Sequence, residues 1–160
     1  MKEYEIVIKV KEYTDRSEMP VEDQALLQKA DEATSTSYAP YSNFNVGVAL
    51  LMENGEIISG SNQENSASPS GLCAERVAMF YANAHFPNVP IVAIAVSSSI
   101  NGVLNSTPIY PCGSCRQSLL ENEQRFGNSI KVIMGSTKAI KVVNSIKDLL
   151  PFSFDLSDYQ

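Results

Sequence analysis

The chain has 160 residues, 44% of them hydrophobic and 19% charged, which suits one domain with a single core and excludes a disordered chain. The net charge is −6 at pH 7. An acidic surface repels phosphate backbones, so a small-molecule partner is expected and no nucleic acid. No stretch approaches the roughly eighteen consecutive apolar residues of a membrane span, and the first residues lack the apolar core of a secretion signal. A cytoplasmic location with no membrane partner is therefore expected.

The first half of the chain opens on an alternating pattern. Tyr4, Ile6, Ile8 and Val10 are apolar at every second position, which predicts an extra strand within an N-terminal extension of residues 1–20. Helical spacing of apolar residues predicts a helix over residues 21–35, followed by a loop punctuated by proline. Residues 44–52 and 56–60 are predicted to form a hairpin, because an Asn-Gly pair separates two apolar runs.

Helices and strands alternate through the remainder of the chain. Beyond a polar loop at residues 62–72, helices are predicted over 73–84, 113–123 and 145–150, and strands over 91–97, 130–134 and 138–143. This alternation predicts an α/β fold of three layers, α/β/α, with a mixed sheet of about five strands. The whole of residues 21–160 is predicted to form one domain, since no linker or repeat divides it.

Three cysteines stand at the starts of two predicted helices, in the segments Cys73-Ala-Glu-Arg and Pro-Cys112-Gly-Ser-Cys115. A redox dithiol would need no third cysteine, and a closed structural zinc site would need a fourth ligand. The single histidine, His85, lies at the far end of its helix. Three protein ligands with one open position are typical of a catalytic zinc, whereas inert buried thiols are the plainer alternative.

These motifs resemble those of the zinc-dependent nucleoside deaminases, and the remaining matches resemble the small cytidine deaminases in particular. The resemblance extends from about Leu26 to Phe154. The matching segments, in the same order along the chain, are Tyr38-Ala-Pro-Tyr-Ser-Asn-Phe-Asn-Val-Gly-Val-Ala-Leu50, Asn62-Gln-Glu-Asn65, Cys73-Ala-Glu-Arg76, Pro111-Cys-Gly-Ser-Cys-Arg-Gln117 and Leu149-Leu-Pro151.

The resemblance implies an enzyme of pyrimidine salvage that hydrolyses cytidine and deoxycytidine to uridine and deoxyuridine, with release of ammonia. It implies one Zn²⁺ per chain, held by Cys73, Cys112 and Cys115. It also implies that a zinc-bound hydroxide attacks C4 of the base while Glu75 carries the protons. The sequence does not rank cytidine against deoxycytidine.

Arg76 lies three residues after Cys73 on one helix face, from which its guanidinium can donate hydrogen bonds to the sulfurs. Three thiolates make an electron-rich zinc site, and these bonds, together with the two helix N-termini, would offset part of that negative charge. A surface ion pair is the alternative for Arg76.

Substrate contacts are implied at four further residues. Asn62 and Glu64 lie two apart at a strand end, so both side chains point the same way, and by resemblance they bind the ribose 3′-OH. Phe44 would stack on the pyrimidine, and the backbone of Ala74 would contact the carbonyl oxygen of the base. The alternatives are a polar loop that satisfies its own backbone and a core aromatic.

The resemblance also implies a homotetramer with active sites shared between subunits. The low charged fraction and the apolar residues 149–154 agree with buried interfaces. Ser66, Ser68 and Phe154 are the candidates to reach a neighbouring site. Ser68 stands where the family usually has tyrosine, which weakens the expected contact between that ring and the ribose.

Three other functions remain open. A deaminase of another base more often has histidine as the first ligand, and an RNA enzyme should show a basic face. A deaminase of nucleoside analogues or aminopyrimidines is a closer alternative, which the Asn62 and Glu64 pair disfavours. A non-catalytic zinc-binding module would not require Glu75.

Overall fold

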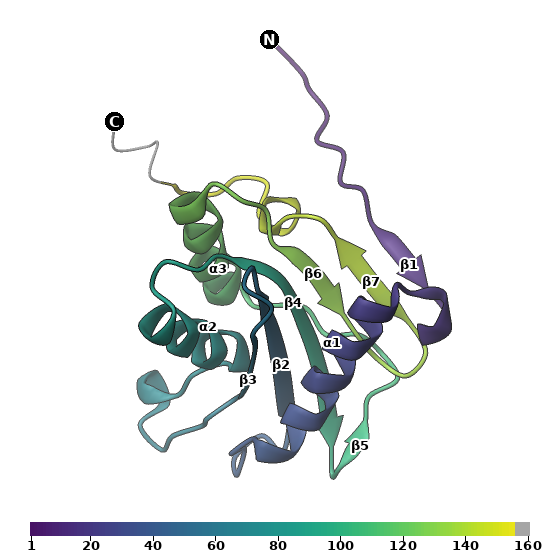
Figure 1. Cartoon of the computed structure of the whole chain (residues 1–160), viewed down its shortest axis with the longest axis vertical. Helices are drawn as coiled ribbons and strands as arrows, with labels where there is room; N and C mark the ends of the chain where they lie inside the picture. The colour runs from purple at the N-terminus through teal and green to yellow at the C-terminus, as the bar shows by residue number, and fades with distance from the viewer. Residues whose placement is uncertain (156–160) are drawn as a thin grey trace.

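The computed structural model describes residues 1–155 as a mixed seven-stranded sheet with helices on both faces (Figure 1). The strand order is β1-β7-β6-β4-β2-β3, and β5 pairs with β4. Only the β4–β6 pairing is parallel among the strand pairs of this region. The strands are β1 (Lys11–Tyr13), β2 (Asn45–Met52), β3 (Ile57–Ser61), β4 (Ile91–Ile100), β5 (Val103–Leu104), β6 (Lys131–Met134) and β7 (Ile140–Val143).

Three α-helices complete the layers: α1 (Val21–Ala33), α2 (Ala74–His85) and α3 (Gly113–Phe126). Because side chains alternate along a strand, β2 presents Leu50 to the core beneath α2 and α3, and Ala49 to a second core beneath α1. The predicted three-layer arrangement is confirmed. Short 3₁₀ helices lie at Arg16–Glu18 (η1), Thr34–Thr36 (η2), Ser68–Ser70 (η3) and Ile146–Leu149 (η4).

The strand prediction was correct for five strands, β2, β3, β4, β6 and β7, and differs from the structure at the other two. The short β5 was not predicted. The extra N-terminal strand exists, but it is β1 rather than residues 4–10, which pair with nothing within residues 1–155 and extend away from the sheet (Figure 1). Lys11 pairs with Val142 and β7 ends at Val143, so the neighbouring strand offers no backbone beyond that point.

The direction of three strands places the N-termini of α2 and α3 at one edge of the sheet. β3 and β4 are both antiparallel to β2, and β6 is parallel to β4, so β3, β4 and β6 run the same way. Helix α2 follows β3 and helix α3 follows β4. Both helices therefore begin at the carboxyl ends of these strands, where α/β proteins usually place their sites.

Close packing at Gly60 fixes α2 against β3. A Cβ at Gly60 would lie 2.8 Å from the backbone nitrogen of Ala78 and 3.0 Å from the Ala74 oxygen. Only glycine permits this approach, which brings the first turn of α2 beside the segment that follows β3.

No helix within residues 1–155 is long and apolar enough to cross a bilayer.

Candidate active site

The two helix N-termini bring the three cysteine sulfurs together. Cys73 is the N-cap of α2, Cys112 is the N-cap of α3, and Cys115 lies in the first turn of α3. The Sγ atoms of Cys73 and Cys112 are 3.9 Å apart, those of Cys112 and Cys115 are 3.4 Å apart, and all three lie within 4.8 Å of one another. Neither N-cap sulfur caps its own helix, which leaves both free to serve as ligands.

The spacing of the sulfurs fits a tetrahedral zinc ion. Zn–S bonds of about 2.3 Å place two thiolates of a tetrahedral site roughly 3.8 Å apart, close to the two separations observed. His85 lies at the opposite end of α2, where it stacks on Tyr81. The cluster thus offers three ligands, which leaves the fourth position of a tetrahedral site open.

Hydrogen bonds within the cluster shift the pKa values of two of its thiols in opposite directions. A hydrogen bond from Cys115, with further support from Arg76, lowers the pKa of Cys73 to about 5. The same hydrogen bond and burial raise the pKa of Cys115. The thiolate of Cys73 is therefore stabilised by its neighbours, and a divalent ion would allow all three thiols to ionise.

Arg76 points at the sulfurs as expected. Its Nη2 lies 3.8 Å from Cys73 Sγ, and its buried Nε has no hydrogen-bond partner within the described part of the chain. A guanidinium with an unmatched donor beside thiols suits a cluster that becomes anionic, as a three-thiolate zinc site is.

Glu75 lies beside this cluster and is almost completely buried, at 5% exposure. Burial is the largest cause of its raised pKa, and the charge of Cys73 adds to it. Two residues apart on a helix would place Cys73 and Glu75 on different faces. Cys73, however, is the N-cap with extended backbone (φ −68°, ψ 152°), so its side chain does not follow the helical repeat.

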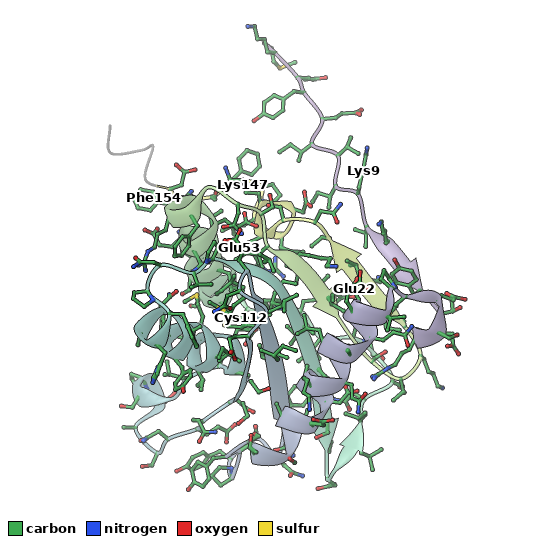
Figure 2. All side chains as sticks on the ribbon, in the orientation of Figure 1. Lys9, Glu22, Glu53, Cys112, Lys147 and Phe154 are labelled. Carbon is green, nitrogen blue, oxygen red and sulfur yellow. The ribbon has the colours of Figure 1, made fainter. Side chains whose placement is uncertain are left out.

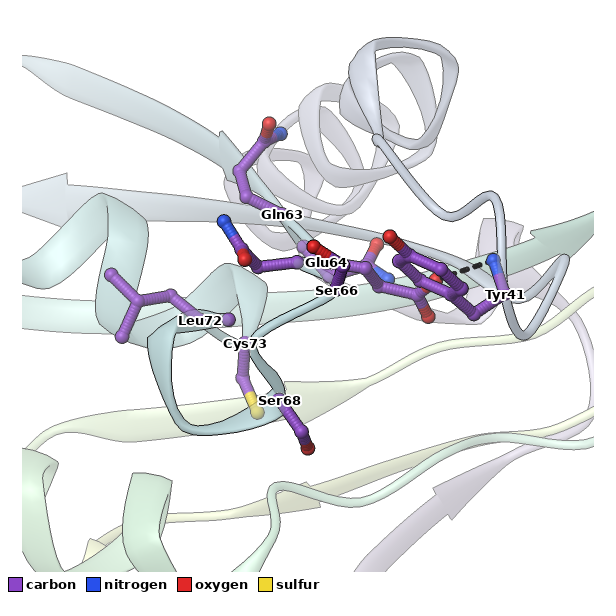
Figure 3. A pocket seen from close by; sticks show the side chains of 10 residues that line it. Tyr41, Gln63, Glu64, Ser66, Ser68, Leu72 and Cys73 are labelled. Atoms are coloured by element: carbon purple, nitrogen blue, oxygen red, sulfur yellow. Dashed lines mark hydrogen bonds between the residues drawn. The ribbon is translucent and has the colours of Figure 1, made fainter.

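An open cavity of about 480 Å³ adjoins Cys73 (Figure 3). It brings together five of the predicted site residues, and Tyr41 also lines it. These five are Asn62, Glu64, Ser66, Ser68 and Cys73. Ser66 and Ser68 are exposed on its rim, and Ser68 begins η3.

Glu64 is held by the loop that precedes β2. The backbone amides of Tyr41 and Ser42 donate to its Oε2 at 2.9 and 3.3 Å, and the Ser42 hydroxyl donates to Oε1. These bonds, the Ser42 hydroxyl first, lower the pKa of Glu64. Its carboxylate is therefore fixed in the ionised, accepting form.

Asn62 braces the same loop from the end of β3. Its Oδ1 accepts from Ser37 Oγ at 2.5 Å and from Val46 N at 2.8 Å, and its Nδ2 donates to Phe44 O at 3.0 Å. Both polar side chains thus satisfy a loop backbone, the alternative weighed from the sequence, and both also line the cavity.

Three predicted substrate or partner residues lie apart from the cavity lining. Phe44 borders a separate, smaller hollow together with residues 105–109. Ala74 is fully buried at the start of α2, next to Cys73. Phe154 is exposed, and its carbonyl accepts a hydrogen bond from Gln117 on α3.

Ser42, Tyr41 and Arg116 are site residues that the sequence analysis did not single out. Arg116 donates to the carbonyls of Pro111 and Leu149 and so fixes the start of α3, which carries two of the cysteines. All three lie inside motifs already quoted, Tyr-Ser before Phe44 and Cys-Arg-Gln after Ser114. That position was the signal that could have identified them.

Comparison with known proteins gives the same family by sequence and by structure. Residues 20–126 match the family described as the cytidine and deoxycytidylate deaminase zinc-binding region. A cytidine deaminase of Halalkalibacterium halodurans is 36% identical over 135 residues, which cover 84% of this chain and 96% of the relative. One from Mycobacterium tuberculosis is 35% identical over 141 residues, 88% of this chain and 96% of the relative.

Among solved structures, the cytidine deaminase of Burkholderia pseudomallei superposes with a TM-score of 0.69 at 37% identity, covering 85% of this chain and all of that one. Residues 20–126, which the family model matches, contain α2, α3 and the three cysteines of the cluster. On this evidence the chain belongs to the zinc-binding cytidine and deoxycytidylate deaminase family.

Proposed function

We propose that the protein is a zinc-dependent cytidine deaminase, which adds water at C4 of cytidine or deoxycytidine and releases ammonia and the uracil nucleoside. The observation that carries this proposal is the three-sulfur cluster beside the buried carboxyl of Glu75, next to a cavity lined by Asn62 and Glu64. The relatives named above carry the same activity in their names.

Cys73, Cys112 and Cys115 would hold one zinc ion. When bound, zinc supplies Lewis acidity that makes water nucleophilic near neutral pH. Arg76 donates to the thiolate of Cys73 and limits the negative charge of the cluster.

Glu75 moves the protons in this mechanism. Its carboxylate takes a proton from the attacking water and delivers it to N3 of the base, then takes the proton of the resulting C4 hydroxyl and gives it to the amino group, which leaves as ammonia. Burial supports this role, because a raised pKa brings the carboxyl closer to the pH at which it must both accept and donate.

The remaining residues would orient the nucleoside. Glu64 is an ionised acceptor for the ribose 3′-OH, and the Asn62 amide has a second hydrogen beyond the one it donates to Phe44 O. Ala74 would offer its backbone to the base carbonyl, and Phe44 would stack on the ring.

A homotetramer completes the proposal. Ser66 and Ser68 are exposed on the cavity rim, and Phe154 is exposed near the end of the described chain, so all three are accessible to a neighbouring subunit. Reduced thiols in the cluster favour the cytoplasm, where the enzyme would serve pyrimidine salvage.

A matched pair of variants tests the function. Glu75→Gln should keep about one zinc per chain and lose at least 10²-fold in kcat on cytidine, because a positioned proton carrier contributes on that order. Glu53→Gln, an exposed turn residue, is the control and should match the wild type.

The substrate is identified with the same preparations. Deamination of cytidine, deoxycytidine, free cytosine and CMP is followed by absorbance. Turnover of the two nucleosides well above that of cytosine supports the ribose contacts. A zinc-loaded protein inert toward all four, or a Glu75→Gln variant as fast as wild type, would refute the proposed activity or the role of Glu75.

A further inference from the structure

Residues 1–10 are exposed and unpaired, although their sequence is that of a strand. Tyr4, Ile6, Ile8 and Val10 all lie open to solvent, and the segment leads directly into β1 at the edge of the sheet. Figure 2 shows the segment extending from the body of the subunit, with Lys9 near its base. Four apolar side chains in one alternating row are costly to leave in water.

The charges of this segment reverse sign about Val7. Glu3 and Glu5 precede Val7 at the odd positions, and Lys9 and Lys11 follow it at the same spacing. In an extended strand these side chains share one face with Val7, and the apolar row occupies the other. Two copies of the segment that run in opposite directions therefore carry complementary charges.

We propose that residues 3–11 of two copies of this chain pair as antiparallel strands about a two-fold axis through Val7. In this register Glu3 faces Lys11 of the second copy and Glu5 faces Lys9, and the symmetry repeats both pairs. Tyr4 faces Val10, and Ile6 faces Ile8. The occupant of this surface is therefore a second copy, and the contact involves no active-site residue.

Other pairings are poorer. Parallel strands in register would set each glutamate against a glutamate and each lysine against a lysine, which is destabilising. A shift of two residues from the proposed antiparallel register opposes charge to Val7 and loses half of the ion pairs. A shift of one residue moves the apolar row against the charged face.

Continuity with the sheet supports the same partner. β1 already pairs with β7 through Lys11, Glu12 and Tyr13, and β7 ends one residue beyond the partner of Lys11. The subunit's own sheet therefore provides no neighbour for residues 3–10, whereas a second copy provides one that extends β1 without a break. Pairing on the side of Lys11 that faces away from β7 then satisfies one of the two open rows of backbone groups of residues 3–10.

Single cysteines at exposed positions test the register in the full chain. Val7→Cys lies on the proposed axis and faces its own copy, within reach of a disulfide. Glu3→Cys is the matched control, because the two copies of residue 3 would be about 26 Å apart at 3.3 Å per residue. Zinc-loaded proteins are oxidised mildly, and dimers are quantified on non-reducing gels against the wild type.

We expect at least tenfold more cross-linked dimer from Val7→Cys than from Glu3→Cys or the wild type. Equal cross-linking of the two variants would indicate parallel or unspecific association and overturn the register. Cross-linking at the wild-type level in both variants would overturn pairing with a second copy and indicate that the segment binds another surface.

Charge exchange in the Val7→Cys background gives a second test. Adding E3K and E5K leaves only lysines, and adding K9E and K11E leaves only glutamates, so each protein alone should lose cross-linking at least fivefold. A mixture of the two should recover it as a heterodimer, identified by mass. If mixing recovers nothing, or if neither exchange reduces cross-linking, the proposed ion pairs are refuted.

Discussion

The pKa values of two carboxyl groups near the cavity are shifted in opposite directions by their surroundings. Glu75 is buried, and burial raises its pKa. Glu64 accepts three hydrogen bonds from Tyr41 and Ser42, which lower its pKa. Such a division, with one group kept ionised and one able to exchange a proton, is a common way to assign separate tasks to two carboxylates.

The raised pKa of Glu75 predicts the acid limb of the pH profile. The carboxylate must be ionised to take a proton from water, so activity is present above its pKa and is lost as the pH falls through that value. We therefore expect kcat/KM for cytidine to decline on the acid side at a pH above the usual glutamate range of about 4.3. An acid limb at or below that range would contradict the effect of burial.

Ser42 predicts a separable effect on substrate binding. Its hydroxyl donates to Glu64, and its oxygen accepts from Phe44 N. Ser42→Ala should raise KM for cytidine about fivefold, with a smaller change in kcat and unchanged zinc content, since it frees the Glu64 side chain, which would position the ribose. Ser35→Ala, exposed on the surface, is the control. A fall in kcat at constant KM would place the effect in the chemical step instead.

At the scale of elements, one buried side chain joins the end of α3 to two segments that follow it. Glu123 accepts from Ile130 N at 2.7 Å before β6, and from Ile146 N at 2.8 Å in η4, and Ser145 Oγ adds a bond at 2.9 Å. The same helix carries Cys115 at its other end. This carboxyl thus anchors the helix that presents two of the three sulfurs of the cluster.

Glu123→Gln should lower the free energy of unfolding by about 2 kcal/mol, because the amides of Ile130 and Ile146 both donate to Oε1, and a neutral carboxamide oxygen accepts more weakly than a carboxylate oxygen. Chemical denaturation of the zinc-loaded protein measures it. Glu121→Gln, two residues away and exposed on the same helix, should change stability by less than about 0.5 kcal/mol. Equal effects in both variants would show that the internal hydrogen bonds of Glu123 contribute little.

At the scale of the whole molecule, zinc would act as a crosslink between α2 and α3. Helix α2 precedes β4 in the chain and helix α3 follows it. Their N-termini meet only because β3, β4 and β6 run in the same direction. A ligand that binds only the folded protein stabilises it by mass action, about 4 kcal/mol at a thousand times its Kd.

Removing zinc with a chelator should therefore abolish deamination and lower Tm by about 10 °C, on the basis of roughly 2–4 °C per kcal/mol at this size. Adding zinc back should restore both, and magnesium, which prefers oxygen ligands, should restore neither. Full activity after complete loss of zinc would contradict the metal assignment.

Local patterns were sufficient for the sulfur cluster and most of the fold. The cysteines were recognised because each motif stands at a helix start, and helix starts depend on neighbouring residues. Five strands were placed for the same reason, since alternation and turn residues are local signals. That the two cysteine motifs meet in space is not a local property of the sequence. It follows from the directions in which the strands run.

The sequence by itself determined the three cysteines of the cluster, the carboxyl of Glu75 beside them, and an alternation of helices and strands that permits few arrangements. Only the tertiary structure decided that Glu64 and Asn62 brace the loop before β2, and that Phe44 borders a different hollow. It also decided that residues 4–10 remain unpaired, although their pattern is that of a strand. The reason is common to all three: a pattern along the chain fixes which conformation a segment prefers, but a contact needs a partner, and the length of β7 or the course of a loop lies far away in sequence.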